Sequence, residues 1–292
     1  MGSEGYCPTG KLQKLLLATD RSEYSEGAIR EAINFAKKCS SSLYVMSVLE
    51  TNPEYETIGA SAYQKEEQEA TKYLQSVKNR ADQEGLPYCK AVLHYGEEPC
   101  QLIIDAAHER NVDMIIIGRR GRSGLMKVLM GKVAAKVVGH APCKVLVVPR
   151  AARIECRNIL VATDGSAHSA AAVSEAIGIA KRCGSNIIAV SSVHSEEELE
   201  EAKANVRKVV EMAHKEGIKA EALTPPGRSH DVIVETAGGR GVDLIIMGTY
   251  GKTGLKKILM GSSTEKVVGH ASCAVLVVKA APPVKEQCVS HG

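Results

Sequence analysis

The chain contains two copies of one sequence pattern, and this internal repeat limits the possible folds more than any other feature. The stretch LLLATDRSEYSEGAIREAINFAKKC, from Leu15 to Cys39, matches ILVATDGSAHSAAAVSEAIGIAKRC, from Ile159 to Cys183, at an offset of 144 residues. A second stretch, VDMIIIGRRGRSGLMKVLMGKVAAKVVGHAPCKVLVV, returns as VDLIIMGTYGKTGLKKILMGSSTEKVVGHASCAVLVV at an offset of 130. A repeat of this length indicates one structural unit written twice. We expect domain one over 1–150 and domain two over 151–292, with a disordered tail from about 280.

Within each copy, short apolar runs alternate with helical patterns. The runs of copy two are NILVAT, NIIAVSSV, KAEAL, DLIIMG and CAVLVV, and the helical patterns lie near 166–183, 196–216, 231–237 and 262–268. Nearly continuous Val/Ile-rich strands separated by helices are typical of a parallel sheet covered on both faces. The pattern predicts an α/β fold of two tandem doubly wound, Rossmann-like domains, each with a five-stranded, mainly parallel sheet.

Composition excludes several classes of protein. The formal net charge is +3 over 292 residues, and the chain has 9 Tyr, 1 Phe and no Trp. Such a chain has few positive charges in excess to bind phosphates and few aromatic rings to stack on bases, which argues against a nucleic acid partner. No run approaches the roughly 20 apolar residues of a membrane span. Nine cysteines without an export signal predict reduced thiols in a cytoplasmic protein. The cysteines expected to be small core residues are Cys39, Cys143, Cys183 and Cys273.

A glycine-rich segment follows the fourth apolar run of copy two, with the spacing Gly248-x2-Gly251-x9-Gly261-Ser262. Gly251-Lys252-Thr253 suggests a Walker A loop, but that loop needs four residues between its first glycine and Gly-Lys-Ser/Thr. Here only two residues separate Gly248 from Gly251. The dinucleotide pattern GxGxxG is absent as well. Neither of the familiar phosphate loops is present.

The segment nevertheless has features that favour an anion. We expect Gly248 to permit close approach to a base or sugar at the end of a buried strand, and Gly251 to permit a positive φ in the turn. Ser262 and Glu265 have the spacing of a capping box, with Ser262 as N-cap of the next helix. Free amides, the helix dipole and the hydroxyls of Ser262, Ser263 and Thr264 would attract a phosphate. The alternative is a well-capped helix after a glycine turn, with no ligand.

Together with VATDGS at the end of the first strand and GHASCAVLVV at the carboxyl end, this loop resembles the universal stress protein family in its tandem two-domain form. The resemblance covers both copies. It implies an adenine-nucleotide-binding fold that dimerises through its last strands and holds ATP with Mg²⁺ or Mn²⁺. For this chain the resemblance implies that the last strands of the two copies, KVLVV and AVLVV, pair within the chain as in a dimer; a homodimer of whole chains stays open. It also implies a stress-response regulator that acts by nucleotide-dependent contact with a protein partner, whose identity the sequence does not give.

The resemblance assigns site residues in both copies. In copy two they are Ala162, Thr163, Asp164, Val193, Met247, Gly248, Gly251, Gly261, Ser262 and Ser263. In copy one a second, weaker site comprises Ala18, Asp20, Val48, Gly118, Gly121, Gly131 and Lys132. We expect weaker binding there because Lys132, Val133 and Ala134 replace the three hydroxyls of copy two, unless Arg119, Arg120 and Arg122 compensate. For Asp164, an Asx-turn ahead of Ser166 is the structural alternative.

The sequence shows no combination of residues typical of a catalytic site, such as His–Asp or Ser–His, beside this loop. Asp20 and Asp164 are the acidic candidates, and the resemblance places them on the nucleoside side. His140 and His270, in the repeated VVGH, are interpreted as helix caps. We therefore expect binding, with slow ATP hydrolysis at most. The alternatives are a scaffold of the same fold without a functional nucleotide, or an adenylating or pyrophosphatase-type enzyme. The Ser-Gly-Gly-x-Asp-Ser loop of such enzymes is not present.

Overall fold

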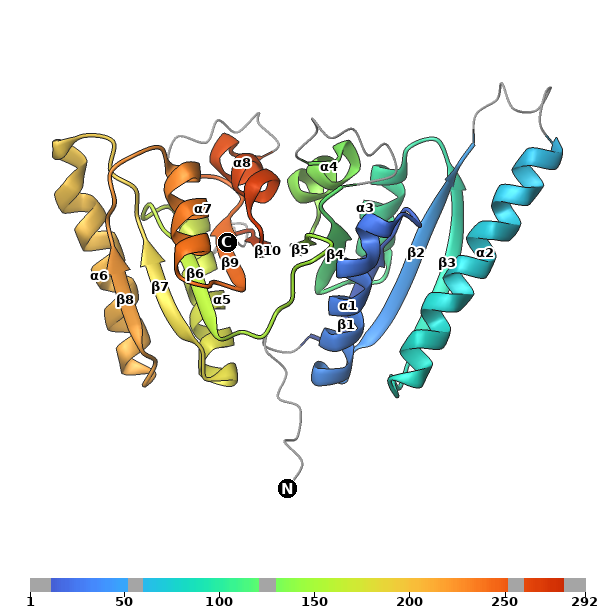
Figure 1. Ribbon diagram of the computed structural model, residues 1–292, viewed down its shortest axis with the longest axis horizontal. Helices are drawn as coiled ribbons and strands as arrows, with labels where there is room; N and C mark the ends of the chain where they lie inside the picture. The colour runs from blue at the N-terminus through green and yellow to red at the C-terminus, as the bar shows by residue number, and fades with distance from the viewer. Residues whose placement is uncertain (1–11, 52–59, 121–129, 252–259, 281–292) are drawn as a thin grey trace, which may run out of the picture.

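The computed structural model describes residues 12–51, 60–120, 130–251 and 260–280. Ten strands in these ranges form one sheet, in the order β3-β2-β1-β4-β5-β10-β9-β6-β7-β8 (Figure 1). The strands are β1 (Lys14–Ala18), β2 (Ser42–Glu50), β3 (Cys89–Gly96), β4 (Met114–Gly118), β5 (Lys144–Val148), β6 (Asn158–Ala162), β7 (Asn186–Val190), β8 (Ala220–Leu223), β9 (Leu244–Gly248) and β10 (Ala274–Val278). The helices are α1 (Glu26–Cys39), α2 (Ala60–Gln83), α3 (Pro99–Glu109), α4 (Lys132–His140), α5 (Ala167–Cys183), α6 (Leu199–Lys215), α7 (Ser229–Gly239) and α8 (Ser262–His270).

Each copy contributes five parallel strands, and the two halves meet at one antiparallel pair. That pair is β5 with β10, in a register that places Leu146 opposite Leu276. Both leucines are 1% exposed. The predicted α/β class, the five-stranded mainly parallel sheet in each copy and the pairing of the last strands are confirmed.

Helices cover both faces of the sheet, and each face has a hydrophobic core that both copies share. One core packs α1, α2, α5 and α6 against the sheet, and the other packs α3, α4, α7 and α8. Leu146 and Leu276 belong to the first core, while their neighbours Val145, Val147, Val275 and Val277 belong to the second. Alternate residues of β5 and β10 therefore carry both cores across the junction.

Local sequence accounts for most element boundaries. The helix predicted from 166 is α5, whose N-cap Ser166 accepts a hydrogen bond from the Ser169 amide at 3.2 Å. The helix predicted from 196 begins as a 3-10 turn, Glu196–Glu198, and continues as α6. The strand predicted over NIIAVSSV is shorter than expected, because β7 ends at Val190. Val193 instead forms an isolated bridge with Pro226, in the loop that follows β8.

Three polar contacts tie the copies together beside the β5–β10 pair. Lys144 of β5 donates to Glu175 of α5 at 2.8 Å. Lys279, directly after β10, donates to the carbonyls of Gly139 and Ala141 at the end of α4. Burial lowers the pKa of the Lys279 ammonium.

The third contact runs in the opposite direction, from copy one to copy two. Arg119, directly after β4, donates to the Ala271 carbonyl at the end of α8 at 2.5 Å. Ala141 and Ala271 are equivalent at the repeat offset of 130. Each helix end thus receives a cation from the other copy, but from a different position in the sequence. The repeat is symmetric in its backbone and asymmetric in these contacts.

The expectation for the cysteines is only partly met. Cys273 is buried at 7% exposure, and burial raises the pKa of its thiol to about 11. Cys183, expected in the core, is exposed because it lies at the last position of α5. Cys39 is disulfide-bonded rather than reduced. The expectation of a reduced thiol is therefore wrong for Cys39, which packs against the core, and the expectation of a core position is wrong for Cys183, which is a free thiol.

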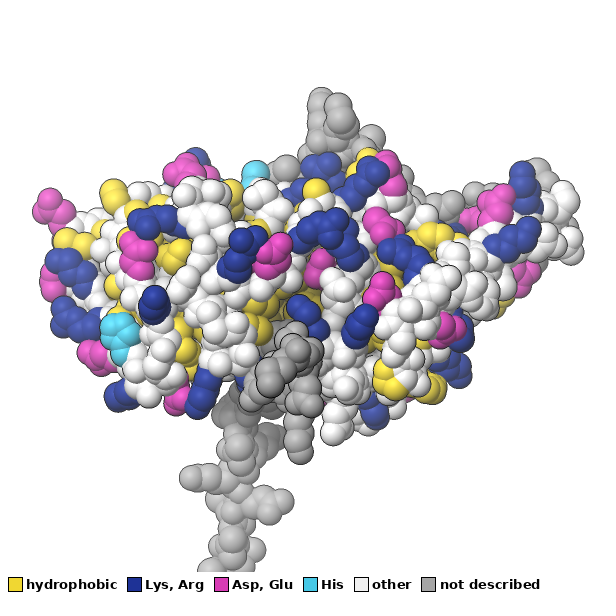
Figure 2. Space-filling view, turned by 60° about the horizontal axis from the view of Figure 1, so that its bottom comes forward, with side chains coloured by type: hydrophobic (Ala, Val, Ile, Leu, Met, Phe, Trp, Pro, Cys, Tyr) yellow, Lys and Arg dark blue, Asp and Glu magenta, His cyan; other side chains and the backbone are white. Residues whose placement is uncertain are grey.

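Within the described ranges, no helix is both long and apolar enough to cross a membrane. On the face shown in Figure 2, Lys and Arg side chains are interspersed with Asp and Glu. This mixture agrees with the formal net charge of +3. The tail predicted to be disordered from about 280 lies almost wholly outside the described residues.

The ion pair across the junction gives a test of how strongly the two copies are coupled. The side chains of Lys144 and Glu175 are 17% and 19% exposed, whereas those of Lys136 and Glu98, 3.3 Å apart, are 53% and 69% exposed. We expect Lys144→Ala to lower the free energy of unfolding by about 1–3 kcal/mol, because it leaves a largely buried carboxylate without its partner. Lys136→Ala should change it by less than about 0.5 kcal/mol. Urea unfolding followed by circular dichroism measures both variants, and equal effects would contradict the expectation.

Candidate functional site

The predicted site residues of copy two meet at the carboxyl edge of its half-sheet. β6 lies between β7 and β9, so the strand order reverses at β6. In a doubly wound sheet, such a reversal opens a crevice beyond the carboxyl ends of the strands. Ala162 ends β6 and Gly248 ends β9, and these two strands pair in parallel. The segments that follow the two strands therefore lie beside one another.

Asp164 follows β6 and combines a structural role with a position in the site. Its Oδ1 accepts a hydrogen bond from the Ser166 amide at 3.0 Å, which forms the Asx-turn considered as the alternative. Its Oδ2 points toward the turn after β9, since a Cβ built on Gly251 would lie 2.6 Å from that atom. The turn thus uses one carboxylate oxygen, and the other is directed at the glycine segment.

Gly248 and Gly251 permit two different close contacts. A Cβ on Gly248 would lie 2.7 Å from the carbonyl carbon of His168, which belongs to the first turn of α5. At Gly251 the obstacle would be the Asp164 carboxylate, which is the end of a side chain. Glycine at 248 therefore lets a helix approach a strand end, and glycine at 251 makes room for a charged group. The positive φ predicted for Gly251 is wrong.

The beginning of α8 differs from the predicted capping box. Gly261 is the N-cap, with φ −63° and ψ 140°, and Ser262 is the first helical residue. The Gly261 amide donates to the Thr249 carbonyl at 2.9 Å. The N-cap therefore lies one residue earlier than the Ser-x-x-Glu spacing predicts. The predicted role of Ser262 as N-cap is therefore wrong. The shift leaves the Ser262 side chain exposed, on the first turn of the helix.

Thr264 was expected to offer its hydroxyl to an anion, and it does not. Its side chain is 3% exposed, and its Oγ1 donates to the Gly248 carbonyl at 3.0 Å. This contact holds the first turn of α8 against the end of β9. Ser262 and Ser263 remain as the hydroxyls of that turn, exposed and half-buried respectively.

The remaining predicted residues of copy two line the edge from the strand side. Met247 is 5% exposed and lies in the same core as Val190. Thr163 donates its amide to the Val190 carbonyl at 2.9 Å, and its Oγ1 accepts the Gly165 amide at 3.3 Å. Val193 is 9% exposed, and its amide and carbonyl bond to the loop after β8. Thr163 and Val193 thus also have structural roles.

Copy one places its predicted residues in the same positions. Asp20 Oδ1 accepts hydrogen bonds from the Ser22 amide and from the hydroxyls of Ser22 and Ser25, at 2.7–3.1 Å. Its Oδ2 is buried and has no hydrogen-bond partner among the described residues. Gly131 is the N-cap of α4, and its amide donates to the Arg119 carbonyl at 2.9 Å, as Gly261 does to Thr249. Gly121 and Arg122 lie outside the described residues.

The side chains of copy one nevertheless change the chemistry of its edge. Lys132 is exposed at the start of α4, and Val133 packs against the core where copy two has Ser263. Arg119, considered as a compensating cation, already donates to Ala271 across the junction. Ala18 and Val48 belong to the core beneath this edge, and Gly118 ends β4.

Histidines near the copy-two site have structural partners. His168 Nδ1 accepts the Ala280 amide at 3.2 Å, and its ring meets that of Tyr250 edge-on at 5.3 Å. His270 Nδ1 donates to the Lys266 carbonyl at 2.7 Å, within the last turn of α8. The interpretation of His270 as a helix-end residue agrees with this contact. Sequence reasoning did not find the packing of His168 against Gly248, because the two residues are far apart in the chain.

The sequence model of the universal stress protein family matches two parts of the chain, residues 11–149 and 155–279. The chain belongs to this family. A universal stress protein of Methanocaldococcus jannaschii is 38% identical over 146 residues, 44% of this chain and 85% of that protein. One from Synechocystis is 31% identical over 150 residues, 46% of this chain and 96% of that protein. The crystal structure of a universal stress protein from Archaeoglobus fulgidus, 23% identical, shares the fold with a TM-score of 0.76 over 93% of this chain and 97% of that chain.

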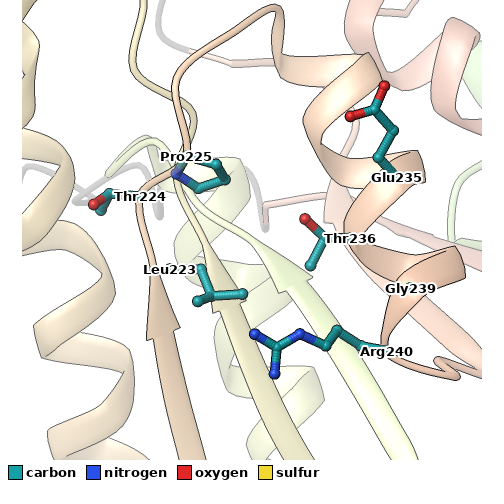
Figure 3. A pocket seen from close by; sticks show the side chains of 7 residues that line it. All are labelled: Leu223, Thr224, Pro225, Glu235, Thr236, Gly239 and Arg240. Atoms are coloured by element: carbon teal, nitrogen blue, oxygen red, sulfur yellow. The ribbon is translucent and has the colours of Figure 1, made fainter.

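This universal stress protein also has a cavity of about 460 Å³ outside the predicted site, between the end of β8 and α7 (Figure 3). It is lined by Leu223, Thr224, Pro225, Glu235, Thr236, Gly239 and Arg240. Arg240 donates to Glu221 of β8 at 3.0 Å. In copy one the corresponding arginine, Arg110, lies over the ring of Tyr44 at 3.8 Å. The cavity includes none of the predicted nucleotide-site residues.

The contact between Gly248 and His168 predicts a cost for any side chain at 248. We expect Gly248→Ala to lower the free energy of unfolding by about 1–3 kcal/mol, because the new methyl group meets backbone that cannot rotate away. Gly238→Ala on α7 is the matched control, since a Cβ at that position would have nothing within 4 Å; it should be neutral or stabilising by up to about 1 kcal/mol. Chemical denaturation of both variants tests the difference, and a neutral Gly248→Ala would show that α5 is not packed against β9 as described.

Proposed function

We propose that copy two of this universal stress protein binds an adenine nucleotide, with ATP as the expected ligand, at the carboxyl edge of β6 and β9. The observation that carries the proposal is the approach of three elements to that edge. Asp164 after β6 faces Gly251 after β9, and Thr264 holds the first turn of α8 against the end of the same strand. A carboxylate and a helix N-terminus are thereby placed at one strand-order reversal.

The phosphate end of the ligand would lie on the first turn of α8. Helix geometry leaves the amides of Ser262 and Ser263 without an acceptor inside the helix, and the helix dipole favours negative charge there. Ser262 adds an exposed hydroxyl beside those amides. Gly261 and Thr264 hold this turn in place. The Gly261 amide bonds to the Thr249 carbonyl after β9, and the Thr264 hydroxyl bonds to the carbonyl of Gly248, the last residue of β9.

The nucleoside end would lie over β6 and β7. A carboxylate oxygen is an acceptor that suits ribose hydroxyls, and Asp164 directs its Oδ2 toward the glycine turn while its Oδ1 forms the Asx-turn. Apolar side chains for contact with a base would come from Ala162 at the end of β6, Met247 near the end of β9, and Val193 in the segment after β7. This arrangement matches the family resemblance, in which these positions line the adenine and ribose.

A divalent metal would be held mainly by the phosphates of the ligand. No group of three or more His, Cys, Asp or Glu residues able to hold a metal lies within the described ranges. Mg²⁺ commonly keeps several waters and uses one or two carboxylates together with substrate phosphates. Asp164 is the carboxylate positioned to take part.

The proposed role is regulatory, through a nucleotide-dependent change in the surface offered to a protein partner. A ligand shifts a conformational equilibrium only by binding one state better than another, and phosphate contacts at the first turn of α8 would supply that difference. Hydrolysis needs a group that positions water and groups that stabilise the transferring phosphoryl. Asp164 lies on the nucleoside side, so we expect turnover to be slow at most.

Copy one is proposed to bind more weakly. Lys132 supplies a charge but no hydroxyl, Val133 is apolar, and Arg119 is engaged by Ala271. The buried, unpartnered Oδ2 of Asp20 keeps one polar feature of the site. A scaffold whose nucleotide is absent is the second candidate function, and the altered edge of copy one is the observation that favours it for that half.

Isothermal titration with ATP and Mg²⁺ separates the two copies. Wild-type protein should show one tight equivalent per chain, and Ser262→Ala should weaken it about two- to tenfold, the effect of losing one hydrogen bond of about 0.5–1.5 kcal/mol. Ser174→Ala, an exposed serine in the middle of α5, is the matched control and should bind as wild type. Lys132→Ser should leave the tight site unchanged.

The same experiment can contradict the assignment. Unchanged affinity in Ser262→Ala, with weakened binding in Lys132→Ser, would place the tight site in copy one. Acid extraction of the purified chain, followed by chromatography, identifies any co-purified adenine nucleotide and its stoichiometry. Protein that carries no nucleotide and takes none up in titration would support the scaffold.

A further inference from the structure

Two cysteines meet on the opposite side of copy two from the proposed nucleotide site. Cys156 lies in the linker before β6, and Cys183 is the last residue of α5. The hydroxyl of Ser185, two residues after Cys183, donates to the Cys156 carbonyl, and the Asn186 amide donates to the Arg157 carbonyl, so the backbone places the end of α5 beside Cys156. Cys156 is 6% exposed, whereas Cys183 is the exposed member of the pair. One thiol can thus react with a solute, and the other is held behind it.

The surrounding contacts fix Cys156 in this position. Its amide donates to Asp243 Oδ1 at 2.9 Å, and its carbonyl accepts the hydroxyl of Ser185. Its backbone lies in the left-handed region, with φ 54°. Contacts on both sides of the peptide therefore hold the thiol against the end of α5.

The charges around the pair favour a thiolate at the exposed position. The hydrogen bond from Cys156, together with the positive charges of Lys38 and Arg182, lowers the pKa of the Cys183 thiol to about 7, against the opposing effects of burial and Asp243. The same hydrogen bond, burial and Asp243 raise the pKa of Cys156. Burial raises the pKa of the thiols of Cys89, Cys143 and Cys273 to about 11. Cys183 is thus distinguished from these described cysteines in both exposure and charge.

The internal repeat offers an independent comparison. Cys39 occupies the position of Cys183 in copy one, at the end of α1 and at the offset of 144. Cys39 is disulfide-bonded. The same helix end therefore carries a disulfide-bonded cysteine in one copy and a free cysteine in the other.

We propose that Cys156 and Cys183 form a dithiol that hydroperoxides oxidise to a disulfide, which ties the linker between the two copies to the end of α5. The Cys183 thiolate attacks one oxygen of hydrogen peroxide, the O–O bond breaks, and hydroxide leaves and takes up a proton. The resulting sulfenic acid is attacked by the Cys156 sulfur. The S–S bond forms, and water leaves with the thiol proton. Two thiols and one peroxide give one disulfide and two waters.

The linker is a position where such a bond has structural consequences. Upstream of Cys156 it contacts copy one, where Arg30 of α1 donates to the Ala152 carbonyl, and Arg150 forms an ion pair with Glu23. Downstream it enters β6 of copy two. Oxidation would therefore fix the copy-two end of a segment whose other end is held by copy one.

Peptide mapping of the full-length protein tests the proposal directly. The reduced, desalted chain is treated with hydrogen peroxide at neutral pH, blocked with N-ethylmaleimide and digested without reductant. The expected product is a peptide that joins Cys156 to Cys183, absent in Cys183→Ser and reversed by dithiothreitol. In the Cys156→Ser variant, Cys183 should accumulate as a sulfenic acid that dimedone traps. If serine disturbs folding, Cys156→Ala replaces this variant. Cys273, buried at 7% exposure, is the internal control and should remain a free thiol.

The pH dependence of alkylation separates a reactive pair from two cysteines that are merely adjacent. Iodoacetamide should modify Cys183 with a midpoint near pH 7, because the rate follows the thiolate fraction. Cys156→Ala removes the hydrogen-bond donor and should move that midpoint upward. A wild-type midpoint at the ordinary value of about 8.5, or peroxide treatment that leaves both thiols free to react with maleimide, would overturn the proposal.

Discussion

The antiparallel pairing of β5 with β10 is the interaction on which the rest of the structure depends. Each copy ends in an apolar strand that would leave an exposed, unpaired edge on an isolated domain. Pairing the two edges buries Leu146 against Leu276 and joins both hydrophobic cores across the junction. The carboxyl ends of α4 and α8 lie close to the same junction, since Lys279 and Arg119 bond to their last carbonyls. The two candidate sites are thus parts of one rigid sheet.

Around this shared backbone, the two copies have diverged in their polar contacts. Gly165 takes the left-handed conformation at φ 78° beside Asn205 of α6, while copy one places Arg21 there at φ 67°, paired with Glu66 of α2. The position that carries Ser262 in copy two carries Lys132 in copy one. Duplication supplies two equivalent strand-order reversals, at β1 and at β6, and side-chain substitution gives the two edges different chemistry on the same backbone arrangement.

The two proposed functional features lie on separate sides of copy two. The carboxyl edge brings together Asp164, Gly251 and the start of α8, where phosphate chemistry is favoured. The amino side brings together Cys156 and Cys183, where thiol chemistry is favoured. Both depend on residues that bond to backbone at a strand end: Thr264 at the end of β9, and Asp243 at the entry to β6. Nucleotide binding and thiol oxidation, as proposed, would therefore act on the same sheet at two separate positions.

The sequence by itself determined the duplication, the α/β class, the strand and helix order, and the pairing of the last strands. The first three follow from hydrophobic periodicity and from the repeat, which can be read along the chain, and the pairing of the last strands follows from the family resemblance. It did not determine that Gly261 would replace Ser262 as the N-cap, that Thr264 would bond to Gly248, or that Cys183 would face Cys156. Those features require segments distant in sequence to meet, and only the tertiary structure fixes which backbone carbonyl, amide or thiol lies within reach.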